Sequence, residues 1–225
     1  MPDSKIIFRP WLGIDNVYKG EKQKLLILGE SHYHDCKKDH ECCESTSDTD
    51  RNQLHRNLTI STVKSWIGGS RRSRLSYSVP KLFDCKPNDF WAKVIFYNYL
   101  QDFAGPTGRD RPSEKLWADH DSANAGAFQQ VLDKHEPDRI LVLGKKLWMN
   151  LPSKVPPLVY APEPEARLPL SGDVRSYHPD DRFCYWYGTR RGKRALAMPI
   201  MHPAAIQFSS DEWIEPIANW LSFSK

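Results

Sequence analysis

Continuous apolar runs that end in polar turns are the feature that most restricts the fold of this sequence. Three runs share this pattern and a fourth has similar composition; they cover residues 25–29, 140–144, 195–201 and 91–100. Short uninterrupted apolar runs with β-branched residues are typical of strands covered on both faces, as in a parallel sheet. We therefore expect the chain to build its core around a buried sheet.

Helical patterns lie between and after these runs. They cover residues 59–67, 122–135 and 209–223. Ser209 and Glu212 have the spacing of a capping box, and Pro216 predicts a kink or a later helix start. The alternation of strands and helices predicts an α/β fold, a three-layer α/β/α sandwich with a short, mostly parallel central sheet. One domain is expected over residues 1–225.

Other segments have the composition of turns and loops. Residues 35–57 are polar and contain most of the Cys and several His residues, and residues 151–181 are rich in Pro without a clear period. Both are predicted to be loops. Residues 183–198 carry alternating side chains around a Gly-rich turn, which predicts a β-hairpin.

Composition restricts the compartment and the partners. Hydrophobic residues make up 40% of the chain, and no apolar run approaches the roughly 18 residues of a membrane span. The N-terminus lacks the apolar core of a secretory signal, and five cysteines are an odd number for a disulfide framework. We expect a cytoplasmic monomer with no membrane association. Its net charge of +4 is compatible with a polyanionic partner.

Polar side chains follow the predicted strands. Glu30, Ser31 and His32 follow the first, Asn98 and Gln101 lie at the end of the second, Lys145 and Lys146 follow the third, and His202 follows the fourth. Ligands of open parallel sheets bind outside the carboxyl ends of the strands. These side chains are therefore expected to line one site.

Three motifs resemble those of the uracil-DNA glycosylase superfamily, and they occur in the same order. "GESHYH" at 29–34 is similar to the superfamily's GQDPYH or GE(A/G)PG, "FYNYLQ" contains the Asn of its second strand, and "HPAAI" at 202–206 is similar to HPSPL. The segment "PDRILVLGKKLW" also resembles the superfamily's third strand and turn. The resemblance covers residues 20–225 apart from the insertions.

This resemblance implies a DNA glycosylase, which excises a flipped base and leaves an abasic site. Glu30 is expected to position or activate water, with Asp35 as a reserve, and His202 to stabilise the leaving base. The loop places Ser31 where one branch of the superfamily has Asp. Ile206 matches the residue that fills the vacated base stack.

The base pocket follows from the same resemblance. Asn98 is expected to bind the edge of the base, since its amide both donates and accepts hydrogen bonds. Tyr33, His32 and Gly29 complete the predicted pocket. The excised base stays open between uracil and another damaged or modified base.

Two other functions are compatible with the sequence. "GES" resembles the GDS motif of Ser hydrolases, with Ser31 as nucleophile, although Pro199 occupies the position of that family's Asp. A DNA-binding relative without catalysis is the other alternative, because Ser31 cannot carry the charge of an Asp.

No cofactor is predicted, but one loop contains metal-ligand residue types. Cys36, His40, Cys42 and Cys43 lie close together, and some of them are candidates for a zinc site with non-standard spacing. Free thiols in a polar loop are the simpler interpretation.

DNA is the predicted partner, and three basic clusters are candidates for phosphate contacts. They are Arg71, Arg72 and Arg74; Arg109 and Arg111; and Arg190, Arg191, Lys193 and Arg194. The third cluster lies in the hairpin that leads to His202, so it is predicted to lie near the site and to bind DNA together with Lys145.

Overall fold

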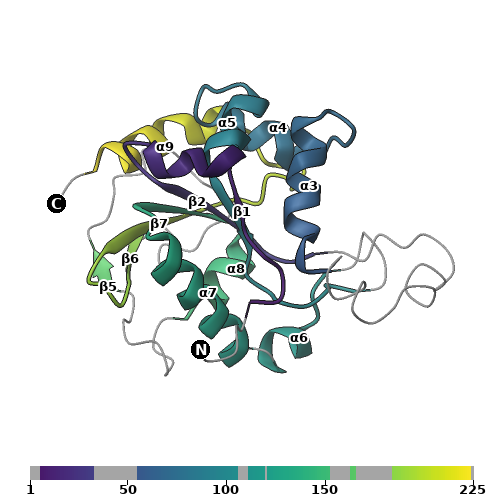
Figure 1. Cartoon of the computed structure of the whole chain (residues 1–225), viewed down its shortest axis with the longest axis vertical. Helices are drawn as coiled ribbons and strands as arrows, with labels where there is room; N and C mark the ends of the chain where they lie inside the picture. Colours follow the sequence, from purple (N-terminus) through teal and green to yellow (C-terminus); the bar gives the residue numbers. More distant parts are fainter. Residues whose placement is uncertain are drawn as a thin grey trace, which may run out of the picture.

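The described strands of the computed structural model form one seven-stranded sheet in the order β1-β3-β2-β4-β7-β6-β5 (Figure 1). The structure describes residues 6–32, 55–105, 111–119, 121–152, 163–165 and 184–223. The strands are β1 (Trp11–Leu12), β2 (Leu25–Gly29), β3 (Ile95–Asn98), β4 (Arg139–Leu143), β5 (Glu163–Glu165), β6 (Cys184–Gly188) and β7 (Arg194–Ile200).

The four central strands are parallel, and three antiparallel strands extend the sheet at its edges. β2 pairs with β3 on one side and β4 on the other, and β4 pairs with β7, all in parallel. β1, β6 and β5 add antiparallel pairs. The prediction of an α/β fold with a mostly parallel sheet is therefore confirmed at that level.

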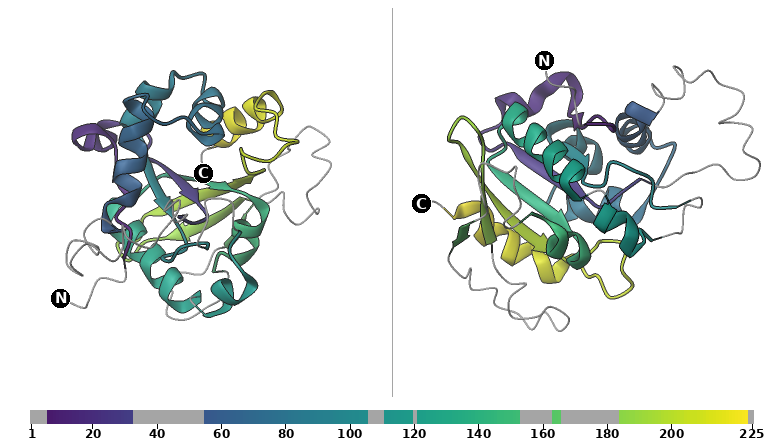
Figure 2. Two further views of the ribbon diagram at one scale, coloured as in Figure 1. Left: turned by 90° about the vertical axis from the view of Figure 1, so that its right-hand side faces the viewer. Right: turned by 90° about the horizontal axis from the view of Figure 1, so that it is seen from below.

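Helices cover both faces of this sheet (Figures 1 and 2). They are η1 (Ile14–Gly20), α3 (Leu58–Ile67), α4 (Arg74–Lys81), α5 (Pro87–Lys93), α6 (Glu114–Asp119), α7 (Asp121–His135), α8 (Lys145–Asn150) and α9 (Asp211–Ser222). One face packs on α3, α4, α5 and α9, and the other on α6, α7 and α8. Alternate strand residues point to opposite faces, so Leu26 and Ile27 belong to different apolar clusters.

Two element predictions need correction. The run 91–100 is not a strand throughout, because Trp91 lies in α5 and the strand begins at Ile95. Pro87 explains the earlier helix, since proline is well suited to a first helical turn. The hairpin prediction is confirmed by the antiparallel pairing of β6 with β7.

The start of α9 also differs from the prediction. Ser210 is the N-cap and makes no side-chain cap, so the predicted capping box of Ser209 and Glu212 does not form. Pro216 lies inside the helix and is buried, and does not mark its start. The helix is held instead by packing, because Trp213 and Trp220 are buried in the core.

Most of the two predicted loops lies outside the described residues. Within 151–181, Glu163–Glu165 forms β5 and pairs with β6, so this segment contains a short strand that its composition did not predict. Among the described helices, none is both long and apolar enough to cross a membrane.

The strand order creates one switch point in the sheet. The chain leaves β2 toward β3 on one side and leaves β4 toward β7 on the other. Ligands of open α/β sheets bind where the connections diverge in this way, at the carboxyl ends of the strands. The residues that follow β2 and β4 are therefore the first candidates for a site.

Candidate active site

The turn after β2 is fixed by continued pairing with the segment after β3. The N–H of Leu100 donates to the carbonyl of Glu30 at 2.9 Å, and the N–H of Ala104 donates to the carbonyl of His32 at 2.8 Å. Backbone hydrogen bonds thus extend beyond the strand ends. This pairing holds Glu30 and His32 on a rigid turn, as a preorganised site requires.

Below this turn lies a buried polar network. The Nδ2 amide of Asn98 donates to the carbonyl of Ser31 and to Nε2 of His32, both at 3.1 Å. Thr59 Oγ1 lies 2.8 Å from the same imidazole nitrogen. Nε2 therefore accepts and His32 is neutral; burial lowers its pKa to about 3. His32 joins β3 and α3 beneath the turn.

Ser31 and Gly29 lie next to this network, the first with a buried hydroxyl and the second packed against Asn98. The Oγ atom of Ser31 is buried and has no hydrogen-bond partner among the described residues. The Oδ1 atom of Asn98 lies over Gly29, where an added Cβ would approach it to 2.2 Å. Gly29 is therefore needed for close packing, because any side chain there would displace the amide.

Glu30 is half-buried at the carboxyl end of β2. Burial raises the pKa of its carboxyl, while the positive charges of Lys146 and Arg111 oppose this rise. A carboxylate with a raised pKa is a better proton acceptor than an exposed one. Glu30 has the environment of a general base with two cations nearby.

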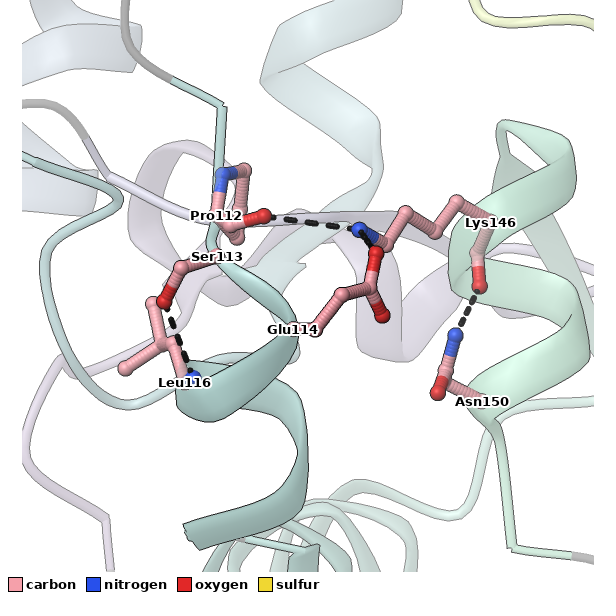
Figure 3. Close-up of polar contacts among 6 residues, drawn as sticks. All are labelled: Pro112, Ser113, Glu114, Leu116, Lys146 and Asn150. Atoms are coloured by element: carbon pink, nitrogen blue, oxygen red, sulfur yellow. Dashed lines mark hydrogen bonds and ion pairs between the residues drawn. The ribbon is translucent and has the colours of Figure 1, made fainter.

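Lys146 links the turn after β4 to the start of α6 (Figure 3). Its Nζ lies 2.6 Å from Oε1 of Glu114 and 3.4 Å from the carbonyl oxygen of Pro112. The same Nζ lies 5.8 Å from the centre of the Trp117 ring. These contacts restrain the ammonium group of Lys146, whose positive charge acts to lower the pKa of Glu30. Lys145, the other predicted cation of this turn, is half-buried in the first turn of α8.

His202 lies at the end of β7, packed against the turn after β4. The backbone N–H of Ala204 donates to its Nδ1 at 3.1 Å, so the ring proton is on Nε2. Burial lowers the pKa of His202, which keeps the ring neutral at pH 7. A Cβ added to Gly144 would lie 3.4 Å from the His202 Cβ, and Gly144 has a φ of +112°. His202 is thus a neutral donor seated on a glycine.

The turn after His202 presents Ile206 to solvent. Ile206 is 87% exposed, so it is not a core residue. Arg74, at the start of α4, donates to the carbonyl oxygens of Ala204 and Ala205 at 3.4 and 3.1 Å. This contact fixes the base of the turn, and Ile206 projects beyond it.

The predicted position of the hairpin cluster is wrong. The β6–β7 turn lies at the amino end of β7, whereas His202 follows its carboxyl end, and seven residues of strand separate the ends by about 20 Å. Three cations of the cluster are also ion-paired, and Cζ of Arg194 lies 5.3 Å from the centre of the Trp186 ring. The pairs are Arg190–Asp133 at 3.2 Å, Arg191–Glu136 at 3.4 Å and Lys193–Asp138 at 3.0 Å. The hairpin turn and its ion pairs therefore lie at the amino ends of the parallel strands, opposite the predicted site.

Several predicted residues lie outside the described parts of the chain. These are Tyr33, Asp35, Arg109 and the zinc candidates Cys36, His40, Cys42 and Cys43. Within the described parts, no three His, Cys, Asp or Glu side chains are grouped to hold a metal ion. Cys85 and Cys184 are free thiols.

The structure thus brings predicted residues to the carboxyl ends of the parallel strands. Asn98 ends β3, Glu30 follows β2 and His202 follows β7. Three strand spacings separate β3 from β7, which gives a width of about 14 Å. Thr59 was not predicted as a site residue, and Arg74 was predicted only as a phosphate contact, because the contacts seen here join them to partners far away in the sequence. Gly144 had a visible signal, the Gly that follows the apolar run as Gly29 does.

Comparison with family models, curated proteins and solved structures finds no match to this chain. The function must therefore be inferred from the site.

Proposed function

We propose that this protein is a DNA glycosylase that flips out a non-standard base and hydrolyses its N-glycosidic bond, leaving an abasic site. The proposal depends most on His202, a neutral imidazole whose Nδ1 accepts the N–H of Ala204 and whose Nε2–H remains as a donor. Such a group can stabilise negative charge on a leaving base without transferring its own proton.

In the proposed reaction, the bond between C1′ of the sugar and the base nitrogen breaks, and its electron pair leaves with the base. The sugar gains oxocarbenium character, as in other glycosidic cleavages. Water adds its oxygen to C1′ and loses one proton to the Glu30 carboxylate, and the departed base takes a proton from solvent. The raised pKa of Glu30 supports its role as the proton acceptor.

The polar network supports a modified role for Asn98. Both hydrogens of its amide are donated within the protein, to Ser31 and His32. In the proposal, Asn98 therefore offers Oδ1 to an N–H on the base edge and holds the turn that carries Glu30. His32 becomes a positioning residue, because both its Nε2 contacts are to protein groups.

Helices on both faces and the parallel order β3-β2-β4-β7 support a three-layer sandwich like that of the uracil-DNA glycosylase superfamily. The exposed Ile206 supports the role of a wedge in the vacated base stack. Lys145, Lys146 and Arg111 provide positive charge near the proposed sugar site.

The Ser hydrolase alternative is not supported by the surroundings of Ser31. A serine nucleophile needs a base within hydrogen-bond reach. Ser31 as a residue is only 8% exposed, and its hydroxyl has no hydrogen-bond partner among the described residues.

The test is a panel of oligonucleotides carrying uracil, hypoxanthine, hydroxymethylated and glucosylated bases, followed by alkaline strand scission. Scission at one modified position, and none in the unmodified control, is expected. Binding without scission of any oligonucleotide would favour the relative that has lost catalysis. Scission that survives the joint loss of Glu30 and His202 would reject the proposed site.

A further inference from the structure

The exposed face of α4 continues the surface of the Ile206 turn. Arg74, Tyr77 and Lys81 lie three and four residues apart, so they share one face of the helix. Arg74 binds the carbonyl groups of the turn, and Lys81 forms an ion pair of 2.9 Å with Asp211 at the start of α9. The segment from the turn to α9 therefore runs alongside this face (Figures 1 and 2).

Two apolar side chains project from this surface. Tyr77 is 52% exposed and Ile206 is 87% exposed. The opposite face of α4 is buried, with Ser76 and Val79 facing the core. Tyr77 is therefore not needed to close the core on that side, and its ring faces solvent between the two anchored ends of the segment.

Positive and negative side chains lie at opposite ends of this surface. Arg71 and Arg72, in the turn before α4, are exposed, and Arg74 adds a third cation at the same end. At the other end, Asp211 and the exposed Glu212 begin α9. A polyanion is favoured at the arginine end and disfavoured beyond Lys81, so a bound phosphate chain would follow the arginines.

We propose that this face, defined by Arg71, Arg72, Arg74 and Tyr77, binds a single-stranded or locally opened segment of DNA, with an unpaired base stacked on Tyr77. Aromatic rings beside basic residues are typical of single-strand recognition, because each base has a face that stacks without regard to sequence. In a closed duplex these base faces are covered by neighbouring bases. The inference rests on the proposed function only in taking DNA as the ligand.

The test measures binding without cleavage, by fluorescence anisotropy on unmodified DNA at physiological salt. Three probes are compared: a single strand, a perfect duplex, and the same duplex with a central mismatched bubble. Tyr77→Ala should weaken binding of the single strand and the bubble by roughly 5- to 150-fold, the range of one base–aromatic stack. Tyr77→Phe retains the ring and should bind as the wild type does.

The arginines have a matched control at the far edge of the sheet. Arg71→Glu with Arg72→Glu should weaken binding of all three probes, whereas Arg190→Glu with Arg191→Glu makes the same charge change and should have little effect. Thermal melting verifies that each variant folds.

Three results would overturn the inference: equal effects of the two double reversals, equal loss of duplex and single-strand binding in Tyr77→Ala, or no binding of any probe. Excision on the oligonucleotide panel is a separate readout. The surface can therefore fail while the glycosylase survives, and the reverse also holds.

Discussion

Polar groups at the amino and carboxyl ends of the parallel strands differ in the partners that they have. At the amino ends, three cations of the β6–β7 turn each meet an acidic partner. At the carboxyl ends, Ser31 keeps a buried hydroxyl without a partner among the described residues, and Glu30 has a carboxyl with a raised pKa. The cations of the turn at the amino ends are thus ion-paired, whereas the Ser31 hydroxyl at the carboxyl ends has no hydrogen-bond partner among the described residues.

Arg139, at the amino end of β4, binds the carbonyl groups at the end of α9. Its guanidinium donates to the carbonyl oxygens of Trp220 and Leu221, each at 3.3 Å, and also to that of Phe223. These carbonyls belong to the last turn of α9 and the residue after it. A cation there satisfies acceptors that the helix itself cannot pair.

This difference indicates where a ligand is expected to bind. Buried polar groups without partners and carboxyls with raised pKa values cost folding free energy, so they are expected where binding or catalysis uses them. Parallel strand direction separates the two ends. The sheet thus has a stabilising edge, at the amino ends of the parallel strands, and a proposed functional edge, at their carboxyl ends.

The largest expected effect is the loss of catalysis at the functional edge. His202→Ala and Glu30→Gln should each lower the excision rate by about 100- to 10,000-fold, the usual contribution of positioned acid–base groups. DNA affinity should change little, because neither side chain is a phosphate contact in the proposal. Lys193→Gln at the stabilising edge is the control. Single-turnover rates equal to wild type in both site variants would contradict the comparison.

Acidification should weaken the fold through histidines whose pKa burial lowers, which are His135 at the amino ends of the strands and His32 with His202 at the carboxyl ends. The pKa of His32 is lowered to about 3 and that of His135 to about 4. Below pH 6.5 the unfolded chain binds protons that the native state refuses, so the free energy of unfolding falls by roughly 1.4 kcal/mol per pH unit for each of these two. Glu30 acts in the opposite direction, because its native pKa is raised.

Urea unfolding from pH 7 to pH 4.5 measures this loss. His135→Gln should reduce the slope between pH 6.5 and 4.5 and leave the contributions of His32 and His202 in place. A slope that is the same in His135→Gln and in the wild type would show that His135 is protonated in the native state.

Two glycines with positive φ sharpen the comparison further. Gly144 has a φ of +112° beside His202, and Gly192 has a φ of +80° with no heavy atom within 4 Å of an added Cβ. Replacing either with Ala should cost about 1–3 kcal/mol of backbone strain. Only Gly144→Ala should also lower the excision rate, because its backbone strain falls on the turn that contacts His202. Melting temperatures and rates measured on both variants separate these effects.

The smallest expected effect concerns the ion pairs of the stabilising edge. Arg190 and Arg191 have side chains that are 68% and 78% exposed, so solvent screens their pairs. Arg190→Met and Arg191→Met should each change the free energy of unfolding by less than about 1 kcal/mol. The change should shrink further in 1 M salt. A loss of several kcal/mol would show that these pairs carry more of the fold than their exposure allows.

The sequence by itself determined the central strands, the helices α3 and α7, the hairpin and the polar residues at the strand ends. These features depend on local periodicity and on short turns, which neighbouring residues encode. The start of β3 was misplaced because α5 and β3 are joined without a break in apolar character, so composition alone does not separate them. The glycosylase function stays a proposal from the resemblance and the site.

Only the tertiary structure decided the partners of these side chains. The imidazole of His32 is tied to Thr59 and Asn98, Arg74 binds the turn before Ile206, and the cations at 190–193 are paired across the far edge. Such contacts join residues tens to more than a hundred positions apart, and they depend on strand direction and on sheet order. Local sequence preference contains no information on strand direction or sheet order. The sequence therefore predicted which residues lie at strand ends, but not at which end of the parallel strands the hairpin turn would lie.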